Sequence, residues 1–168
     1  MDGQRVRFLG IDTPEISENQ PYSKEAKAYV RKYCHKKEIY LTYDEYGDRK
    51  DKFGRLLAFI WAYDKPNGGF LCVNEGVVAQ GLATVYLPRK DAKLTNLRKL
   101  LALQKEARKA KRGIWSNFVD YEVLVTPRGA AYHVAGCRHI VTHRSLRTMM
   151  VSDAADTGLH PCRTCLAD

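Results

Sequence analysis

Apolar and polar residues alternate near the start of the chain, which predicts a β-strand at residues 4–11. Val6 and Phe8 would lie on one face of this strand, and Arg5 and Arg7 on the other. Further runs rich in β-branched, leucine and aromatic residues predict additional extended segments, at 38–44, 55–63, 70–73 and 81–87. Because the turn-forming sequence DKPNGG separates the second and third of these, we expect them to form a hairpin.

Three segments carry helix signals instead. Ser23 is a typical N-cap residue for a helix at 24–35, and Asn74 is expected to cap a short helix. The longest helix is expected at 92–112, where leucines recur at three- and four-residue spacing before a natural stop signal at Gly113. Its other faces are rich in lysine and arginine, and for most of these we expect a solvated surface.

The composition is that of a folded basic domain with a small appendage. The chain has 168 residues, of which 45% are hydrophobic and 28% charged, so it can build a core. A formal net charge of +9 favours a polyanionic partner, chiefly nucleic acid. No apolar run approaches the roughly 18 residues that a membrane span needs, so we expect no membrane partner. The first residues contain no secretory signal, which predicts a cytoplasmic protein unless an upstream signal has been lost.

The acidic segment after the first predicted strand has the residue types of a metal and phosphate site. Asp12 offers a carboxylate and Thr13 a backbone carbonyl, and hard divalent cations prefer such oxygen ligands. An intervening proline stiffens the turn, so Glu15 can be held where it activates a water. Arg7 and Arg55 add guanidinium groups, which bind phosphoryl oxygens bidentately during phosphodiester cleavage. Any one of these residues alone would more simply belong to a salt-bridged loop.

Four motifs resemble the staphylococcal nuclease (thermonuclease) family in order and spacing. They are VRFLGIDTPE, DKFGRLLAFIW, VNEGVVAQGLATVY and a leucine-rich basic helix that ends in RGIW, and together they span about residues 2–116. The resemblance implies an α+β fold, with a five-stranded OB-fold β-barrel and three helices. It also implies a calcium-dependent endonuclease that hydrolyses DNA and RNA with low sequence specificity.

The resemblance also implies roles for individual residues. Arg7 and Arg55 would bind and polarise the scissile phosphate, while Glu15 would act as the general base or position the water. Asp12 and the Thr13 carbonyl would hold calcium. Three further residues would contact nucleic acid, namely Lys52, Phe53 and Tyr86.

One part of the family pattern is not found in this sequence. The family begins with two strands around an Asp-Gly-Asp-Thr motif that supplies another calcium carboxylate, whereas this sequence begins MDGQRVRF. We therefore expect the first hairpin of the barrel to be missing, calcium to bind weakly, and the chain to associate through an exposed strand edge. An alternative function is then a catalytically impaired nucleic-acid-binding OB-fold module. A third possibility is that the tail is the functional unit and the barrel its scaffold.

The C-terminal part contains a second set of candidate ligands. His133 and Cys137 form an H-x₃-C pair, and Cys162 and Cys165 form a C-x₂-C pair. Together they suit one structural zinc ion in a Cys₃His site. The segment resembles short zinc modules of the YHxxxC…PCxxC type appended to bacterial enzymes. It is also similar to the zinc module of the adaptive-response DNA repair methyltransferase, which uses four cysteines instead.

These ligands predict a division of the chain into a nuclease-like domain at 1–118 and a zinc-binding module at 121–168. Cys34 and Cys72 lie outside the ligand set and are expected to be buried apolar residues. Three other histidines remain alternatives to His133 as the fourth ligand, namely His139, His143 and His160.

Overall fold

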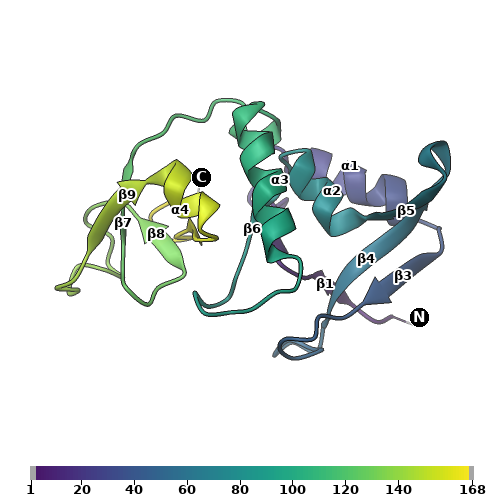
Figure 1. Ribbon diagram of the computed structural model, residues 1–168, viewed down its shortest axis with the longest axis horizontal. Helices are drawn as coiled ribbons and strands as arrows, with labels where there is room; N and C mark the ends of the chain where they lie inside the picture. The colour runs from purple at the N-terminus through teal and green to yellow at the C-terminus, as the bar shows by residue number, and fades with distance from the viewer. Residues whose placement is uncertain (1–2, 167–168) are drawn as a thin grey trace.

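The computed structural model describes residues 3–166, and its N-terminal part is built on a four-stranded sheet (Figure 1). Its longest strand, β4, pairs in parallel with one strand and antiparallel with two others. The four strands are β1 (Val6–Phe8), β3 (Ile39–Thr42), β4 (Leu56–Asp64) and β5 (Gly69–Cys72). Asp64 lies opposite Gly69, so the predicted hairpin between β4 and β5 is confirmed.

A separate antiparallel pair joins β2 (Ile11–Asp12) to β6 (Thr84–Val85). The strand predicted at 4–11 is therefore two strands, because the chain bends between Phe8 and Ile11 and each half pairs with a different partner. The mixed α+β fold is as expected, but within residues 3–166 the sheets do not close into a barrel.

Three helices pack against these strands, namely α1 (Ser23–Cys34), α2 (Val73–Ala79) and α3 (Leu97–Lys109). Their apolar faces and the sheet enclose one core, which includes Ile60, Val77 and Leu100. Ser23 is the first residue of α1 rather than its cap, and the N-cap is Tyr22 in a left-handed conformation.

The longest helix, α3, begins five residues later than its leucine spacing predicts. Just before it, the Thr95 N–H donates a hydrogen bond to a carboxylate oxygen of Asp44 over 2.9 Å. Leu94 is buried in the core although it precedes the helix. A side chain from a distant turn therefore takes the donor that a longer helix would use, which leucine periodicity does not reveal.

Asn74 is the second residue of α2 and does not cap it. Its side chain is fully buried, accepts a hydrogen bond from the Ile60 N–H, and donates to the carbonyls of Leu9 and Ala58. The asparagine therefore joins α2 to β4 and to the end of β1. The predicted cap at Asn74 is wrong because these buried backbone groups compete for the same amide.

The C-terminal unit has its own four-stranded sheet, in the order β10-β8-β7-β9, and one helix. Only β10 and β8 run parallel. The elements of this unit are β7 (Glu122–Val125), β8 (Ala131–His133), β9 (Arg147–Met150), α4 (Val151–Asp156) and β10 (His160–Pro161).

The C-terminal unit packs on α3 through α4 (Figure 1). Buried Gln104 on α3 accepts a hydrogen bond from the Val85 N–H and donates to the Ala155 carbonyl, so it touches both parts. Arg108 donates to Asp156 over 2.7 Å beside it. In the described part of the chain, we find no helix long and apolar enough to cross a membrane.

Candidate functional site

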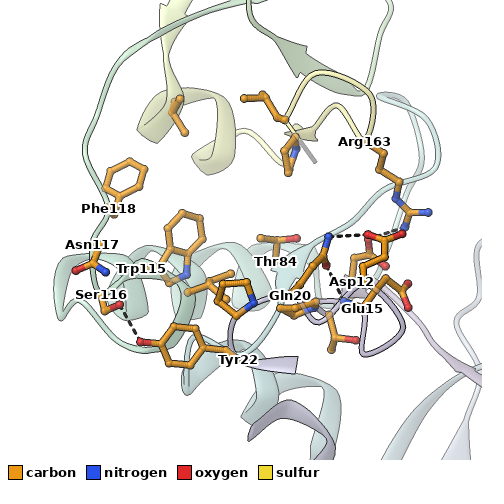
Figure 2. Close-up of a pocket in the computed structure, with 18 of the residues that line it drawn as sticks. Asp12, Glu15, Gln20, Tyr22, Thr84, Trp115, Ser116, Asn117, Phe118 and Arg163 are labelled. Atoms are coloured by element: carbon orange, nitrogen blue, oxygen red, sulfur yellow. Dashed lines mark hydrogen bonds and ion pairs between the residues drawn. The ribbon is translucent and has the colours of Figure 1, made fainter. Parts of the chain in front are cut away.

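The Asp12 carboxylate lies between two guanidinium groups. Arg7 on β1 donates through Nη2 to Asp12 Oδ1 over 3.0 Å and through Nη1 to the Ile11 carbonyl. Arg163, from the C-terminal unit, donates through Nη2 to Asp12 Oδ2 over 2.6 Å (Figure 2). Between β1 and β2, Gly10 has a φ of +77°, and a Cβ there would lie 2.6 Å from Leu94 Cδ2. A glycine is therefore needed at the bend that brings Arg7 to Asp12.

Glu15 lies in the loop after β2, beside Asp12 (Figure 2). The Gln20 side chain accepts a hydrogen bond from the Glu15 N–H over 2.7 Å, which fixes the loop backbone. The Glu15 side chain is exposed, and its carboxylate makes no hydrogen bond or ion pair with any residue in 3–166. It is therefore free to accept a proton or to orient water.

A pocket of about 730 Å³ opens between the acidic loop and the C-terminal unit. Asp12, Thr13 and Glu15 line it on one side, and Arg163 lines it from the other unit. The lining also includes four aromatic side chains, namely Tyr22, Trp115, Phe118 and Tyr132. Carboxylates, a cation and aromatic rings thus share one cavity.

Arg55 belongs to a second cluster, at the turn before β4. Its Nε donates to Asp51 Oδ2 over 2.6 Å, and no hydrogen bond or ion pair joins it to Arg7 or Asp12 in the described chain. Desolvation opposes ionisation of Asp51, but together the hydrogen bonds from the Arg55 backbone and side chain and from the Phe53 N–H hold its pKa below the usual value. Asp51 therefore stays charged and anchors the arginine.

Arg7 lies on β1, and Arg55 directly precedes the neighbouring strand β4. Arg7 is in register with Leu57, which is two residues from Arg55. The pairing of β1 with β4 therefore places the two arginines near one another along the sheet.

Phe53 is an exposed aromatic residue flanked by two cations. Its side chain is 61% exposed, the Lys52 ammonium lies 5.1 Å from its ring centre, and Arg55 Cζ lies 5.5 Å away. An exposed ring with adjoining positive charge is the arrangement on which a nucleobase stacks while cations hold the backbone.

Tyr86 lies next to the Asp12 cluster. Its N–H donates to the Gly10 carbonyl over 2.9 Å, which holds the residue against the glycine bend. Arg7 Cζ and Arg163 Cζ each lie 5.7 Å from its ring centre, and the His160 ring is 4.8 Å away. Tyr86 is thus in contact with both guanidiniums that bind Asp12.

Four side chains in the C-terminal unit converge on one point. The ligand atoms of His133, Cys137, Cys162 and Cys165 all lie within 4.8 Å of one another. The sulfurs of Cys137 and Cys162 are 4.0 Å apart, near the spacing of about 3.8 Å that two Zn–S bonds impose at a tetrahedral angle. The cluster includes His133 and none of the three alternative histidines.

The chemistry of these donors fits a zinc ion. Nδ1 of His133 is buried and has no hydrogen-bond partner within residues 3–166, and burial lowers the pKa of His133, so the ring is neutral as a ligand must be. Burial opposes ionisation of Cys162, but N–H groups of Thr164 and Cys165 hold its pKa below the usual value. A metal ion bound by this cluster would satisfy the buried unpaired nitrogen beside the three cysteine sulfurs.

Comparison with known proteins assigns the N-terminal part of the chain to a protein family. The family model described as staphylococcal nuclease homologue matches residues 5–117, which is over half of the chain. The chain therefore belongs to the staphylococcal nuclease family. This match gives the N-terminal part its OB-like fold.

Several curated relatives carry nuclease names. A thermonuclease of Staphylococcus hyicus is 35% identical over 118 residues, covering 68% of this chain and 64% of that protein. Endonuclease YncB of Bacillus subtilis is 34% identical over 116 residues, or 66% and 51% of the two chains. An uncharacterized protein of Bacillus anthracis is 36% identical over 126 residues, or 70% and 54%. The matches thus cover between about half and two thirds of these relatives.

Sequence reasoning did not find Arg163. The residue lies between Cys162 and Cys165, and the C-x₂-C motif assigns a function only to these cysteines. Its partner Asp12 is 151 positions away. An arginine between two expected metal ligands was the only signal, and it did not indicate a contact with the acidic loop.

Proposed function

We propose that this chain is a calcium-dependent phosphodiesterase that hydrolyses DNA or RNA with low sequence specificity. The observation that carries the proposal is the arrangement around Asp12: Arg7 is bound to it at 3.0 Å, and the free carboxylate of Glu15 lies beside it on one pocket. A guanidinium, a metal-binding carboxylate and a general base are the groups that phosphodiester hydrolysis needs. Family membership supports the same reaction.

Each residue has a distinct role in this proposal. Glu15 takes a proton from the attacking water, and Arg7 and Arg55 bind the phosphoryl oxygens, whose negative charge grows in the transition state. Asp12 and the Thr13 carbonyl would hold calcium, since oxygen donors on one pocket suit a hard cation. Bound calcium would neutralise part of the charge on the reacting phosphate.

The substrate strand would lie across both clusters. Phe53 offers its exposed ring to a base, and Lys52 offers its ammonium to the backbone. Tyr86 would contact a base or phosphate beside Arg7. Stacking on a ring and ion pairing with the backbone tolerate any base, which supports low sequence specificity.

We assign the second metal, zinc, a structural role in the module at 121–168, with the nuclease domain at 1–118. The cluster offers four protein ligands, which leaves no open position for catalysis at a tetrahedral zinc.

The alternative, a nucleic-acid-binding module with impaired catalysis, has one observation in its favour. Both oxygens of Asp12 accept hydrogen bonds from arginines, at 3.0 and 2.6 Å, so a cation must compete for the carboxylate.

Plasmid cleavage by the purified full chain separates the two functions. We expect cleavage with added calcium, and Glu15→Gln is expected to reduce the rate by roughly two to four orders of magnitude because the base is lost. Glu25→Gln is a matched control, because Glu25 is an exposed glutamate of α1 that does not line the pocket, and this variant should cleave at the wild-type rate. Binding of DNA without any calcium-dependent cleavage would leave the binding module as the function.

A further inference from the structure

The C-x₂-C turn of the C-terminal unit carries Arg163 toward the acidic loop. The turn is anchored on β8, because the Cys162 N–H donates to the Tyr132 carbonyl over 3.0 Å. It closes on itself through the Leu166 N–H, which donates to the Cys162 carbonyl over 2.9 Å, and the Thr164 N–H, which donates to the Cys162 sulfur. The backbone of Arg163 is therefore positioned by the same turn that presents two of the cluster's sulfurs.

The Arg163 guanidinium keeps most of its hydrogen-bonding capacity. An arginine side chain has five N–H donors, and within residues 3–166 this one makes a hydrogen bond only to Asp12. The side chain remains 65% exposed at the mouth of the pocket. Several of its donors are thus left for a further acceptor, such as a backbone phosphate.

Two guanidiniums meet beside one aromatic ring at this point. Arg7 and Arg163 flank both Asp12 and the Tyr86 ring, and the Glu15 carboxylate on the same pocket also acts on Arg163 electrostatically. Asp12 holds the two cations in place, while their remaining donors stay available. Paired guanidiniums next to an aromatic ring are suited to a phosphate and its adjoining base.

We propose that Arg163 is a substrate-binding residue, which contacts a backbone phosphate of the nucleic acid and is positioned by the metal-binding turn of the C-terminal unit. This inference rests on the nucleic-acid substrate of the proposed function and adds a contact from outside the nuclease domain. The metal cluster thereby acts on substrate affinity without touching the substrate.

Binding of a fluorescent single-stranded oligothymidylate, measured by anisotropy over a range of salt concentrations, tests the proposal. The measurement uses the full chain in a Glu15→Gln background with calcium, so that the probe is not consumed. Arg163→Ala is expected to weaken binding about tenfold, since a charge-assisted hydrogen bond is lost. The slope of log affinity against log salt should fall by about 0.7, which is the contribution of one phosphate contact to a single strand.

Two comparisons make the result specific. Arg144→Ala removes an exposed arginine of the same unit that does not touch Asp12, and it should leave the salt slope unchanged. Cys165→Ser should reproduce the Arg163→Ala result by loosening the turn, and the double variant should show no further loss, because both changes remove one contact. Arg163→Ala itself should retain the metal content of the parent chain.

The outcomes separate this inference from the proposed function. An Arg163→Ala variant with unchanged affinity and salt slope overturns the inference, even if the wild-type chain cleaves DNA. Tighter binding or faster cleavage by that variant also overturns it, because the contact of Arg163 with Asp12 would then inhibit the site. A chain that never cleaves but binds through Arg163 overturns the proposed reaction and supports the contact.

Discussion

Arg55 is held ready for substrate by a single carboxylate. Asp51 accepts hydrogen bonds from its side chain and backbone, while its guanidinium remains partly exposed next to Phe53. A bound phosphate meets a guanidinium whose direction is already set, so little side-chain entropy is lost on binding. The same logic applies to Arg7, which Asp12 and the Ile11 carbonyl hold from two sides.

Arg55→Ala is expected to lower kcat by roughly two to three orders of magnitude, because one donor to the transition state is removed. Folding should change little, since Asp51 still accepts the N–H of Phe53. Initial rates at saturating DNA and a thermal melt measure the two effects. Arg49→Ala is the matched control, because Arg49 belongs to the same polar turn but packs on Tyr43. A near wild-type kcat in Arg55→Ala would remove Arg55 from the site.

At the scale of elements, the buried side-chain amide of Asn74 joins α2 to β4 and to the end of β1. The fully buried Asn74 pairs with backbone groups at Leu9, Ala58 and Ile60. These contacts fix β1 against β4, and Arg7 projects from β1. A change in α2 can therefore alter the site without contacting it.

Asn74→Ala is expected to destabilise the chain by about 3 kcal/mol, because it leaves buried backbone donors and acceptors unpaired. Urea unfolding at pH 7 measures the change in the free energy of unfolding. Asn67→Ala removes an exposed turn asparagine whose side chain bonds only Asp64 among residues 3–166, so we expect less than about 1 kcal/mol there. Equal effects of the two substitutions would contradict the bridging role of Asn74.

Local sequence patterns predicted the helices and strands but did not predict the long-range hydrogen bonds between them. Alternation located β4 and its hairpin with β5, since side-chain period and turn residues are local signals. The start of α3 and the role of Asn74 depend on partners about 50 and 65 positions away, and no local pattern encodes them. In the same way, spacing indicated His133 and the three cysteines, whereas the path of Arg163 required the packing of α4 on α3.

At the scale of the whole molecule, an ion pair fastens the C-terminal unit to α3. Asp156 on α4 binds Arg108 at 2.7 Å and Lys105 at 2.9 Å. The Arg108 side chain is only 8% exposed, so removing its partner leaves a buried charge. Partial burial opposes ionisation of Asp156, but hydrogen bonds from Lys105 and Arg108 hold its pKa below the usual value.

Asp156→Asn is expected to destabilise the chain by about 2 to 4 kcal/mol at pH 7. Because the folded-state pKa is lowered, the carboxylate stabilises the fold above its unfolded pKa of about 4, and this advantage disappears as the pH falls through the folded-state value. Urea unfolding of both chains between pH 7 and pH 3 should therefore show converging stabilities. Asp153→Asn, an exposed change on the same helix, should differ little from wild type at either pH. A constant gap across the pH range would contradict the ion pair.

The zinc proposal predicts one zinc per chain and a selective response to its removal. A strong chelator should abolish hydrogen-exchange protection in β7 to β9, because a unit this small has little core of its own, while β3 to β5 remain protected. Elemental analysis should find zinc lost in Cys137→Ser but retained in Cys34→Ser, whose cysteine lies outside the cluster. Exchange that is unchanged after chelation would exclude a structural metal.

The contact between Asp12 and Arg163 joins residues 151 positions apart. A ribosome that adds about 5 to 20 residues per second reaches Arg163 roughly 8 to 30 s after Asp12. During that interval Arg7 is the only one of the two arginine partners of Asp12 that has been synthesised. Where zinc is scarce, newly made molecules would remain for longer without the contact between Arg163 and Asp12. The supply of zinc would then set how many molecules present both Arg7 and Arg163 to the substrate.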